Sequence, residues 1–162
     1  MDSLAELVAW HKVFDLSLRY AAGIDQRDWS LYRSCFSDEV RVDFSSFNHR
    51  PASAEPMAAD DWIAVVRRTI EGFESTQHLI GNQRITFDGP DRARYQAYLQ
   101  AQHWMDRDHW YLIGGWYFNE AHRVDGEWKL ATVVLDQRWD AGDRSLLREA
   151  SRRVRERSTT AD

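Results

Sequence analysis

The sequence lacks most of the features that mark secreted, membrane-spanning or metal-clustering proteins. Cys35 is the only cysteine, which excludes an internal disulfide and a cysteine-based metal site. No stretch approaches the run of about 18 apolar residues that a membrane-spanning helix needs. The N-terminal residues include early acidic side chains and show no signal-peptide pattern. These features favour a cytoplasmic protein with no membrane partner.

Basic residues are also outnumbered by acidic ones. The sequence has 21 Lys and Arg against 26 Asp and Glu, which gives a formal net charge of −5. Phosphate binding needs a clustered basic face, so this balance argues against a nucleic-acid partner. The one basic cluster, residues 144–157, also contains Glu149 and Glu156. Such a mixture is typical of a solvated helix face.

Aromatic residues, by contrast, are abundant and include eight Trp. This many Trp residues either fill a bulky core or line an apolar cavity. A length of 162 residues fits one domain around one core. We expect that domain to span residues 1–157, followed by a polar tail over residues 158–162.

Periodic apolar residues predict three helices before the main run of strands. Steps of three and four residues predict a first helix over residues 3–22, with Gly23 as its C-terminal cap. Its apolar stripe would comprise Leu4, Leu7, Val8, Phe14, Leu18 and Ala21. Asp28 is the predicted N-cap of a short second helix over residues 29–36, and a third helix is predicted over residues 59–73.

Strand patterns dominate the rest of the chain. Alternation over residues 39–45 predicts a half-buried strand, and residues 47–58 predict a loop. Four longer strands are predicted over residues 77–87, 92–105, 109–123 and 127–139. Asp125-Gly126 is a strong hairpin signal, and a final helix is predicted around residues 146–154. This order is typical of an α+β fold, in which a curved antiparallel sheet is covered by N-terminal helices around a central pocket.

Two histidines on neighbouring strands are candidates for acid–base chemistry. His78 lies at the start of the first long strand and His103 lies on the next, so adjacent antiparallel strands can bring both into one pocket. Histidine is the commonest general base, and Asp25, just past the first helix, could fix its tautomer and stabilise the imidazolium. No serine or cysteine nucleophile motif accompanies them, which favours proton transfer without a covalent intermediate.

Each of these residues also has a simpler structural explanation. A histidine on an apolar strand face is more often a hydrogen-bonded core residue, and Asp25 could be a loop or capping residue. A polar group formed by His103, Asp106, Asp108 and His109 could suggest a metal site. Its spacing matches no ordinary ligand pattern and a polar hairpin explains it better, so no metal is predicted.

Five segments resemble the scytalone dehydratases in order and spacing, over residues 5–150. They are residues 25–29 (DQRDW), 41–47 (RVDFSSF), 76–81 (TQHLIG), 125–129 (DGEWK) and 138–139 (RW). Residues 112–129 also resemble the hexachlorocyclohexane dehydrochlorinases. Both groups belong, with bile-acid 7α-dehydratase, to the SnoaL-like group of the nuclear-transport-factor-two-like superfamily.

The resemblance implies a cone-shaped barrel, often assembled as a homo-oligomer (trimer or dimer), and catalysis with neither a metal nor an organic cofactor. It implies that His78 removes a proton and that Asp25 supports it. It also matches His103 to a second pocket histidine of the scytalone dehydratases.

This sequence departs from both groups at the positions that assist the leaving group. Two tyrosines that polarise the substrate carbonyl in scytalone dehydratase are replaced by Ile24 and Phe44. The lysine and arginine that help chloride leave in the dehydrochlorinases are replaced by Tyr20 and Val133. Scytalone and hexachlorocyclohexane are therefore not the expected substrates.

The polar residues that remain to polarise or protonate a leaving hydroxyl are Tyr20, Tyr117 and His103. We expect Tyr20, Phe44, Tyr117 and Val133 to contact the substrate, since the resemblance places them at pocket positions of the two enzyme groups, with Tyr117 at about the position of a pocket asparagine of scytalone dehydratase.

Three classes of function remain open. The first is a cofactor-free lyase, most simply a dehydratase, acting on a small hydrophobic ring compound of polyketide, terpenoid or steroid type. An isomerase or cyclase with the same base is a close variant, since only the fate of the carbanion or enolate differs. The second is a non-catalytic module that binds a hydrophobic ligand in the same pocket, because fold does not fix function. The third is a structural role, which predicts no cavity.

Overall fold

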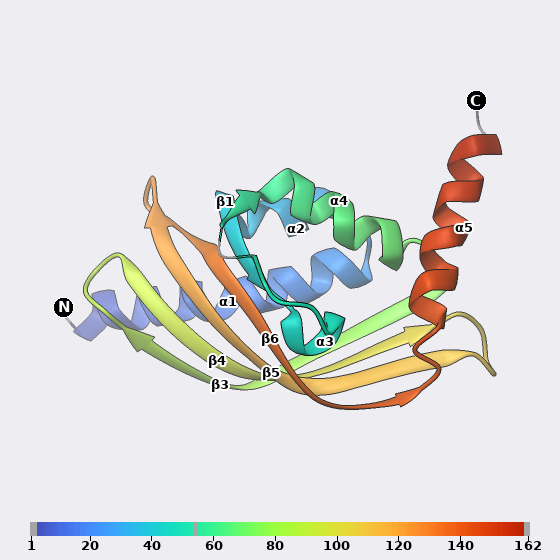
Figure 1. Ribbon diagram of the computed structural model, residues 1–162. Helices are drawn as coiled ribbons and strands as arrows, with labels where there is room; N and C mark the ends of the chain where they lie inside the picture. Colours follow the sequence, from blue (N-terminus) through green and yellow to red (C-terminus); the bar gives the residue numbers. More distant parts are fainter. Residues whose placement is uncertain (1–2, 54, 161–162) are drawn as a thin grey trace.

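The computed structural model describes residues 3–53 and 55–160. Its helices are α1 (Ser3–Asp25), α2 (Trp29–Ser34), α3 (Ser45–Asn48), α4 (Ala59–Ile70) and α5 (Leu146–Thr160). Its strands are β1 (Phe36–Asp43), β2 (Met57–Ala58), β3 (Ser75–Phe87), β4 (Arg92–Trp104), β5 (Trp110–Val124) and β6 (Glu127–Gly142). The strands form a curved sheet, and α1, α2 and α4 lie on its concave side (Figure 1). The predicted α+β class, with N-terminal helices over a curved sheet, is confirmed.

The sheet is a four-strand antiparallel meander, β3 to β6, extended by β1 and β2 in the order β2-β1-β6-β5-β4-β3. Asp125 and Gly126 both have positive φ, 50° and 81°, which suits the predicted tight hairpin turn. β1 runs parallel to β6. Parallel neighbours need a long crossover connection, which α3, α4 and the rest of the meander provide here. The sheet is therefore mixed, and its edge strands β2 and β3 leave the cone open and not closed as a barrel.

Helix α1 is confirmed, but its buried face is not the predicted stripe. The buried side chains are Val13, Leu16, Ser17, Tyr20 and Ile24. Four residues of the predicted stripe are 48–67% exposed, namely Leu4, Leu7, Val8 and Leu18. Apolar residues occupy two faces of this helix, so their spacing alone could not select the face that packs against β3.

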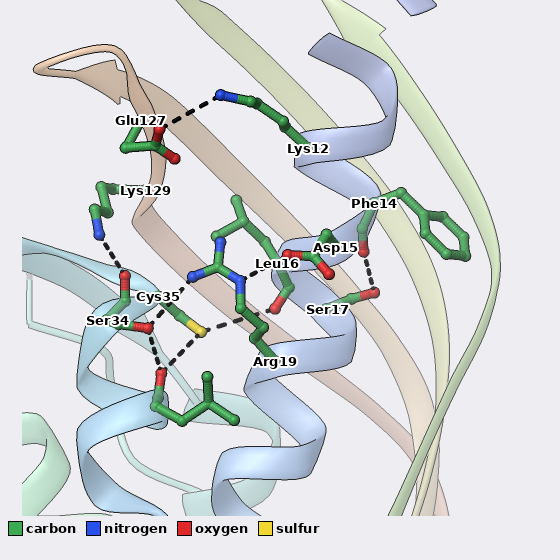
Figure 2. A network of polar contacts seen from close by, with 11 residues as sticks. Lys12, Phe14, Asp15, Leu16, Ser17, Arg19, Ser34, Cys35, Glu127 and Lys129 are labelled. Carbon is green, nitrogen blue, oxygen red and sulfur yellow. Dashed lines mark hydrogen bonds and ion pairs between the residues drawn. The ribbon is translucent and has the colours of Figure 1, made fainter. Parts of the chain in front are cut away.

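Polar contacts fix α1 against α2 and β6 (Figure 2). Arg19 pairs with Asp15 at 2.7 Å and donates to the Ser34 hydroxyl at 3.3 Å, while Lys129 donates to the Ser34 carbonyl at 2.6 Å. Cys35 is fully buried at the same junction, and burial raises the pKa of its thiol to about 11. The only cysteine of the chain is therefore a core residue at this junction.

The prediction that Gly23 caps α1 is wrong, since the helix continues to Asp25. A Cβ at Gly23 would lie 2.7 Å from the backbone nitrogen of Tyr32, so glycine at this position lets α1 and α2 approach closely. The predicted N-cap of α2 is confirmed, because Asp28 Oδ1 accepts a hydrogen bond from the Leu31 backbone N–H at 2.9 Å. This tight junction holds Asp25 at the end of a packed helix.

Other boundaries shift by a few residues. β1 begins at Phe36, and the predicted loop over residues 47–58 contains the end of α3 and the strand β2. Helix α5 continues to Thr160, so residues 158–160 of the predicted polar tail are helical, while residues 161–162 lie outside the described residues. Of the described helices, none combines the length and the apolar character needed to cross a membrane.

Candidate functional site

Asp25 and His78 meet where the end of α1 lies against the start of β3. The Nδ1–H group of His78 donates to Asp25 Oδ1 at 2.7 Å, and the backbone N–H of His78 donates to Asp25 Oδ2 at 2.7 Å. The Thr76 hydroxyl donates to Asp25 Oδ1 at 2.8 Å. The two side chains are 19% (Asp25) and 8% (His78) exposed. Three hydrogen bonds from one strand therefore hold a largely buried carboxylate.

The electrostatics of this contact keep Asp25 ionised. Burial favours the neutral carboxyl, but hydrogen bonds from His78 and Thr76, together with the charge of His78, outweigh it and lower the pKa of Asp25 below its usual 3.8. A carboxylate can only accept hydrogen bonds, so it fixes the proton of a neutral His78 on Nδ1. The lone pair of His78 Nε2 is then available to take a proton.

His78 lies in the wall of an internal cavity of about 180 Å³ between the helices and the concave face of the sheet. The aromatic residues of its lining are Tyr20, Tyr32, Phe44, Phe47, Trp62 and Tyr117. Within residues 3–53 and 55–160, no Asp, Glu, Lys or Arg contributes to this lining. A base inside such a wall works in a medium of low polarity, where each electrostatic contact is stronger than in water.

His103 enters the same cavity from β4, so the structure brings the two candidate histidines together. Their ring centroids are 5.8 Å apart. His103 Nδ1–H donates to the Tyr111 carbonyl at 3.3 Å, and only 5% of the residue is exposed. Burial, with a further contribution from the charge of His78, lowers the pKa of His103 to about 3. At neutral pH His103 is therefore a neutral imidazole whose Nε2 accepts hydrogen bonds, and it is not a proton-donating imidazolium.

Tyr20 and Tyr117 also line the cavity. Their hydroxyl oxygens are 3.3 Å apart, and burial raises the pKa of both phenols well above the usual value of 10.0. Both therefore remain hydroxyl groups that can donate hydrogen bonds. Tyr32 and Trp62, which the sequence analysis missed, also line the cavity, and Trp62 Nε1–H donates to the Tyr32 hydroxyl at 3.1 Å. Their spacing on helices looks the same whether they face a core or a cavity.

The two apolar candidates for substrate contact have different positions. Phe44 lines the cavity and packs edge-on against Trp62, with ring centroids 5.0 Å apart. Val133 is fully buried in the core and is not part of the cavity lining. It lies on β6 opposite Val42 of the parallel strand β1, a pairing that the sequence did not predict.

The polar hairpin between β4 and β5 contains a second histidine–carboxylate pair. His109 Nδ1 lies 2.8 Å from Asp106 Oδ1, and the two side chains are 61% and 50% exposed. Asp106 Oδ1 also accepts from the backbone N–H of Asp108, as expected for a turn. Among the described residues, no group of three or more His, Cys, Asp or Glu side chains is arranged to hold a metal ion.

An open cone of helices on a curved sheet, with a histidine in the wall of its cavity and a carboxylate hydrogen-bonded behind that histidine, is typical of the nuclear-transport-factor-two-like fold. Within it, the family model described as SnoaL-like domain matches residues 5–134. The chain belongs to this SnoaL-like family.

Named relatives lie within the same family. Scytalone dehydratase PfmaJ of Pestalotiopsis fici is 26% identical, over 78% of this chain and 70% of the relative. The solved structure of the Kfla4162 protein of Kribbella flavida has a TM-score of 0.78 and 28% identity, covering 85% of this chain and 95% of that one. Hexachlorocyclohexane dehydrochlorinase LinA-type3 of Novosphingobium barchaimii has a TM-score of 0.71 and 19% identity, covering 88% and 95%. At that identity, the last similarity concerns the fold alone.

Proposed function

We propose that this chain is a cofactor-free lyase, a dehydratase that abstracts a carbon-bound proton with His78 while Asp25 supports the base. The observation that carries the proposal is the 2.7 Å hydrogen bond between His78 Nδ1 and Asp25 at the wall of an apolar cavity. Relatives named as scytalone dehydratases support an enzyme of the lyase type.

The reaction starts with a proton on a carbon next to a carbonyl or similar activating group. His78 Nε2 takes that proton, and the ionised Asp25 stabilises the imidazolium that forms. The electron pair left on carbon then forms the double bond and expels a hydroxyl from the neighbouring carbon. The His78 imidazolium returns the proton to that oxygen, which leaves as water and regenerates the base.

The other polar groups position the substrate in this scheme. His103 accepts a hydrogen bond from a substrate hydroxyl at Nε2, since its own Nδ1–H is held by the Tyr111 carbonyl. One hydroxyl of the Tyr20–Tyr117 pair donates to the other, and the accepting hydroxyl uses its own proton to donate to the developing oxyanion or to the departing oxygen. The described lining offers no Lys or Arg to stabilise a halide anion, which favours loss of water over loss of chloride.

The cavity also limits the substrate. Its volume of about 180 Å³ is below the range of roughly 300–1,000 Å³ typical of pockets for drug-sized ligands. A single small hydrophobic ring of polyketide or terpenoid type matches that volume, and a steroid would enter only in part.

An isomerase or cyclase with the same base is the closest alternative, because proton abstraction is shared. A non-catalytic module for hydrophobic ligands is the alternative in a different class. The experiment is to incubate the protein with a panel of cyclic β-hydroxy ketones and to follow products by mass spectrometry. A dehydratase yields a product lighter by one water. An isomerase or cyclase yields a new product of unchanged mass, and a binding module yields no product.

The variant His78→Gln should lower the rate by ~10²–10⁴ if the imidazole is the base. His109→Gln is the matched control, since this histidine also contacts a carboxylate but lies exposed on a hairpin. A rate for His78→Gln within about threefold of the wild type would reject the proposal, because loss of a general base costs far more than that.

We also propose that the chain forms a homo-oligomer, a trimer or dimer, through the outer face of the sheet. Strand alternation turns large side chains outward between those that line the cavity. They include Leu79 (50% exposed), Tyr98 (50%), Phe118 (40%) and Trp139 (48%). An apolar patch of this kind on a sheet face marks an interaction surface, and a second copy of the same face would bury it.

A further inference from the structure

A second depression lies outside the cavity and shares part of its wall. It has a volume of about 830 Å³ and is formed by α3, α4, α5 and the loop around residue 50. Phe44, Phe47 and Trp62 line both spaces. We call this outer space the vestibule. The vestibule and the inner cavity therefore adjoin each other at these aromatic residues.

The charge of the vestibule is of one sign. Four arginines line it, Arg50, Arg144, Arg148 and Arg155, and no Asp or Glu among the described residues does so. The chain as a whole is acidic, with a formal net charge of −5. A concave surface that collects positive charge against that background attracts anions.

On helix α5, the arginines that line the vestibule lie on a different face from the arginines that pair with glutamate. Arg148 and Arg155 are seven residues apart with Ser151 between them, so all three face the vestibule. The acids of α5 lie on another face, where Glu149 holds Arg152 at 2.7 Å and Arg153 at 3.2 Å. Most arginines of the cluster are exposed, as expected for a solvated helix face, but only some of them are paired with glutamate.

Three of the four arginines are available to a ligand. Arg144 is engaged by the Tyr111 hydroxyl at 2.8 Å and by the Phe47 carbonyl, and its guanidinium lies 4.7 Å from the centroid of the Phe47 ring. In the described part of the chain, Arg50, Arg148 and Arg155 form no ion pair within 4.0 Å. Guanidinium groups bind carboxylate and phosphate oxygens in a two-pronged geometry.

We propose that the vestibule binds an oxyanion, a carboxylate or phosphate group, carried by the hydrophobic substrate of the inner cavity. This inference rests on the proposed function, because it assigns the second half of that same substrate. The inner cavity binds the apolar ring beside His78, and the vestibule binds the anionic substituent between α3 and α5.

The test is calorimetric titration with three probes that share one benzene ring: phenol, benzoate and phenyl phosphate. We expect one or both anions to bind roughly tenfold more tightly than the neutral probe, as charge-assisted contacts predict. The tighter anion identifies the group as carboxylate or phosphate. The double variant Arg148→Gln/Arg155→Gln should abolish the preference, and added salt should weaken it.

Arg152→Gln is the matched control, with the same change of charge per residue on the same helix but outside the vestibule, and it should keep the preference. His78→Ala should also keep it, since binding of the anion does not need the base. Equal affinities for the three probes, absence of binding by both anions, or a preference that survives in the double variant would each overturn the vestibule proposal. None of those results bears on proton abstraction, which is tested by turnover of His78 variants.

Discussion

The protonation state of His103 can be tested through the pH dependence of folding stability. In the folded protein this imidazole is buried beside His78, and its pKa is lowered to about 3 from 6.5. In the unfolded chain it is in water, where a histidine has a pKa of about 6.5. The unfolded state therefore binds more protons between these two values. As a result, stability falls as the pH falls through this window.

The size of the effect follows from the difference in proton binding. One proton of difference per chain changes the free energy of unfolding by about 1.4 kcal/mol per pH unit. From pH 6.0 to pH 4.5 the free energy of unfolding therefore falls by about 2 kcal/mol. The value is slightly below the full amount because His103 of the unfolded chain is not completely protonated at pH 6.0. Two charged groups influence the pKa of His103: His78 lowers it further and Asp25 raises it. Asp25, whose pKa is lowered, destabilises in the same direction only as the pH approaches 3.8.

The assay is urea unfolding followed by Trp fluorescence at pH 6.0 and 4.5, for the wild type and His103→Gln. The variant should lose about 2 kcal/mol less stability over this interval than the wild type. His11→Gln is the control, because His11 lies exposed on α1 and its side chain meets water in both states. Equal pH dependence of the wild type and His103→Gln would refute the neutral-imidazole assignment.

Three further predictions test the scaffold and the assembly. Gly23→Ala should lower Tm, because the new Cβ would lie 2.7 Å from the Tyr32 backbone nitrogen. Gly81→Ala is the control, since nothing lies within 4 Å of its Cβ. Equal Tm values for the two variants would contradict the close approach of α1 to Tyr32. Asp28→Ala should cost about 1 kcal/mol in urea unfolding, and an unchanged midpoint would show that the cap is dispensable. Trp139→Lys should shift the protein towards monomer in analytical ultracentrifugation, and an unchanged mass would argue against the proposed interface.

The sequence predicts the meander and the turn at Asp125-Gly126 well, because both depend on local patterns. It does not predict which face of α1 is buried, because apolar residues occur on two faces and only the packed sheet distinguishes them. The backbone freedom of glycine favours Gly23 as a helix end, whereas in the structure Gly23 allows α1 to approach Tyr32 closely. The parallel pairing of β1 with β6 is a long-range contact, which local periodicity does not encode.

The candidate site divides in a similar way. The positions of Asp25 and His78, at a helix end and a strand start, predict a contact that is present in the structure. The protonation state of His103 could not be predicted, because it depends on burial and on the Tyr111 carbonyl. The sequence also does not predict which arginines of α5 pair with Glu149 and which line the vestibule. That division depends on how α5 packs beside α3 and α4.

The central claim is that Asp25 and His78 together form the base. The most direct measurement is the rate at which the proton next to the carbonyl of a bound cyclic ketone exchanges with D₂O, followed by NMR. Asp25→Asn should slow this exchange by ~10²–10⁴, because the imidazolium loses its partner, while Asp106→Asn, at the exposed hairpin pair, should leave it unchanged. Exchange by Asp25→Asn at the wild-type rate would contradict the account.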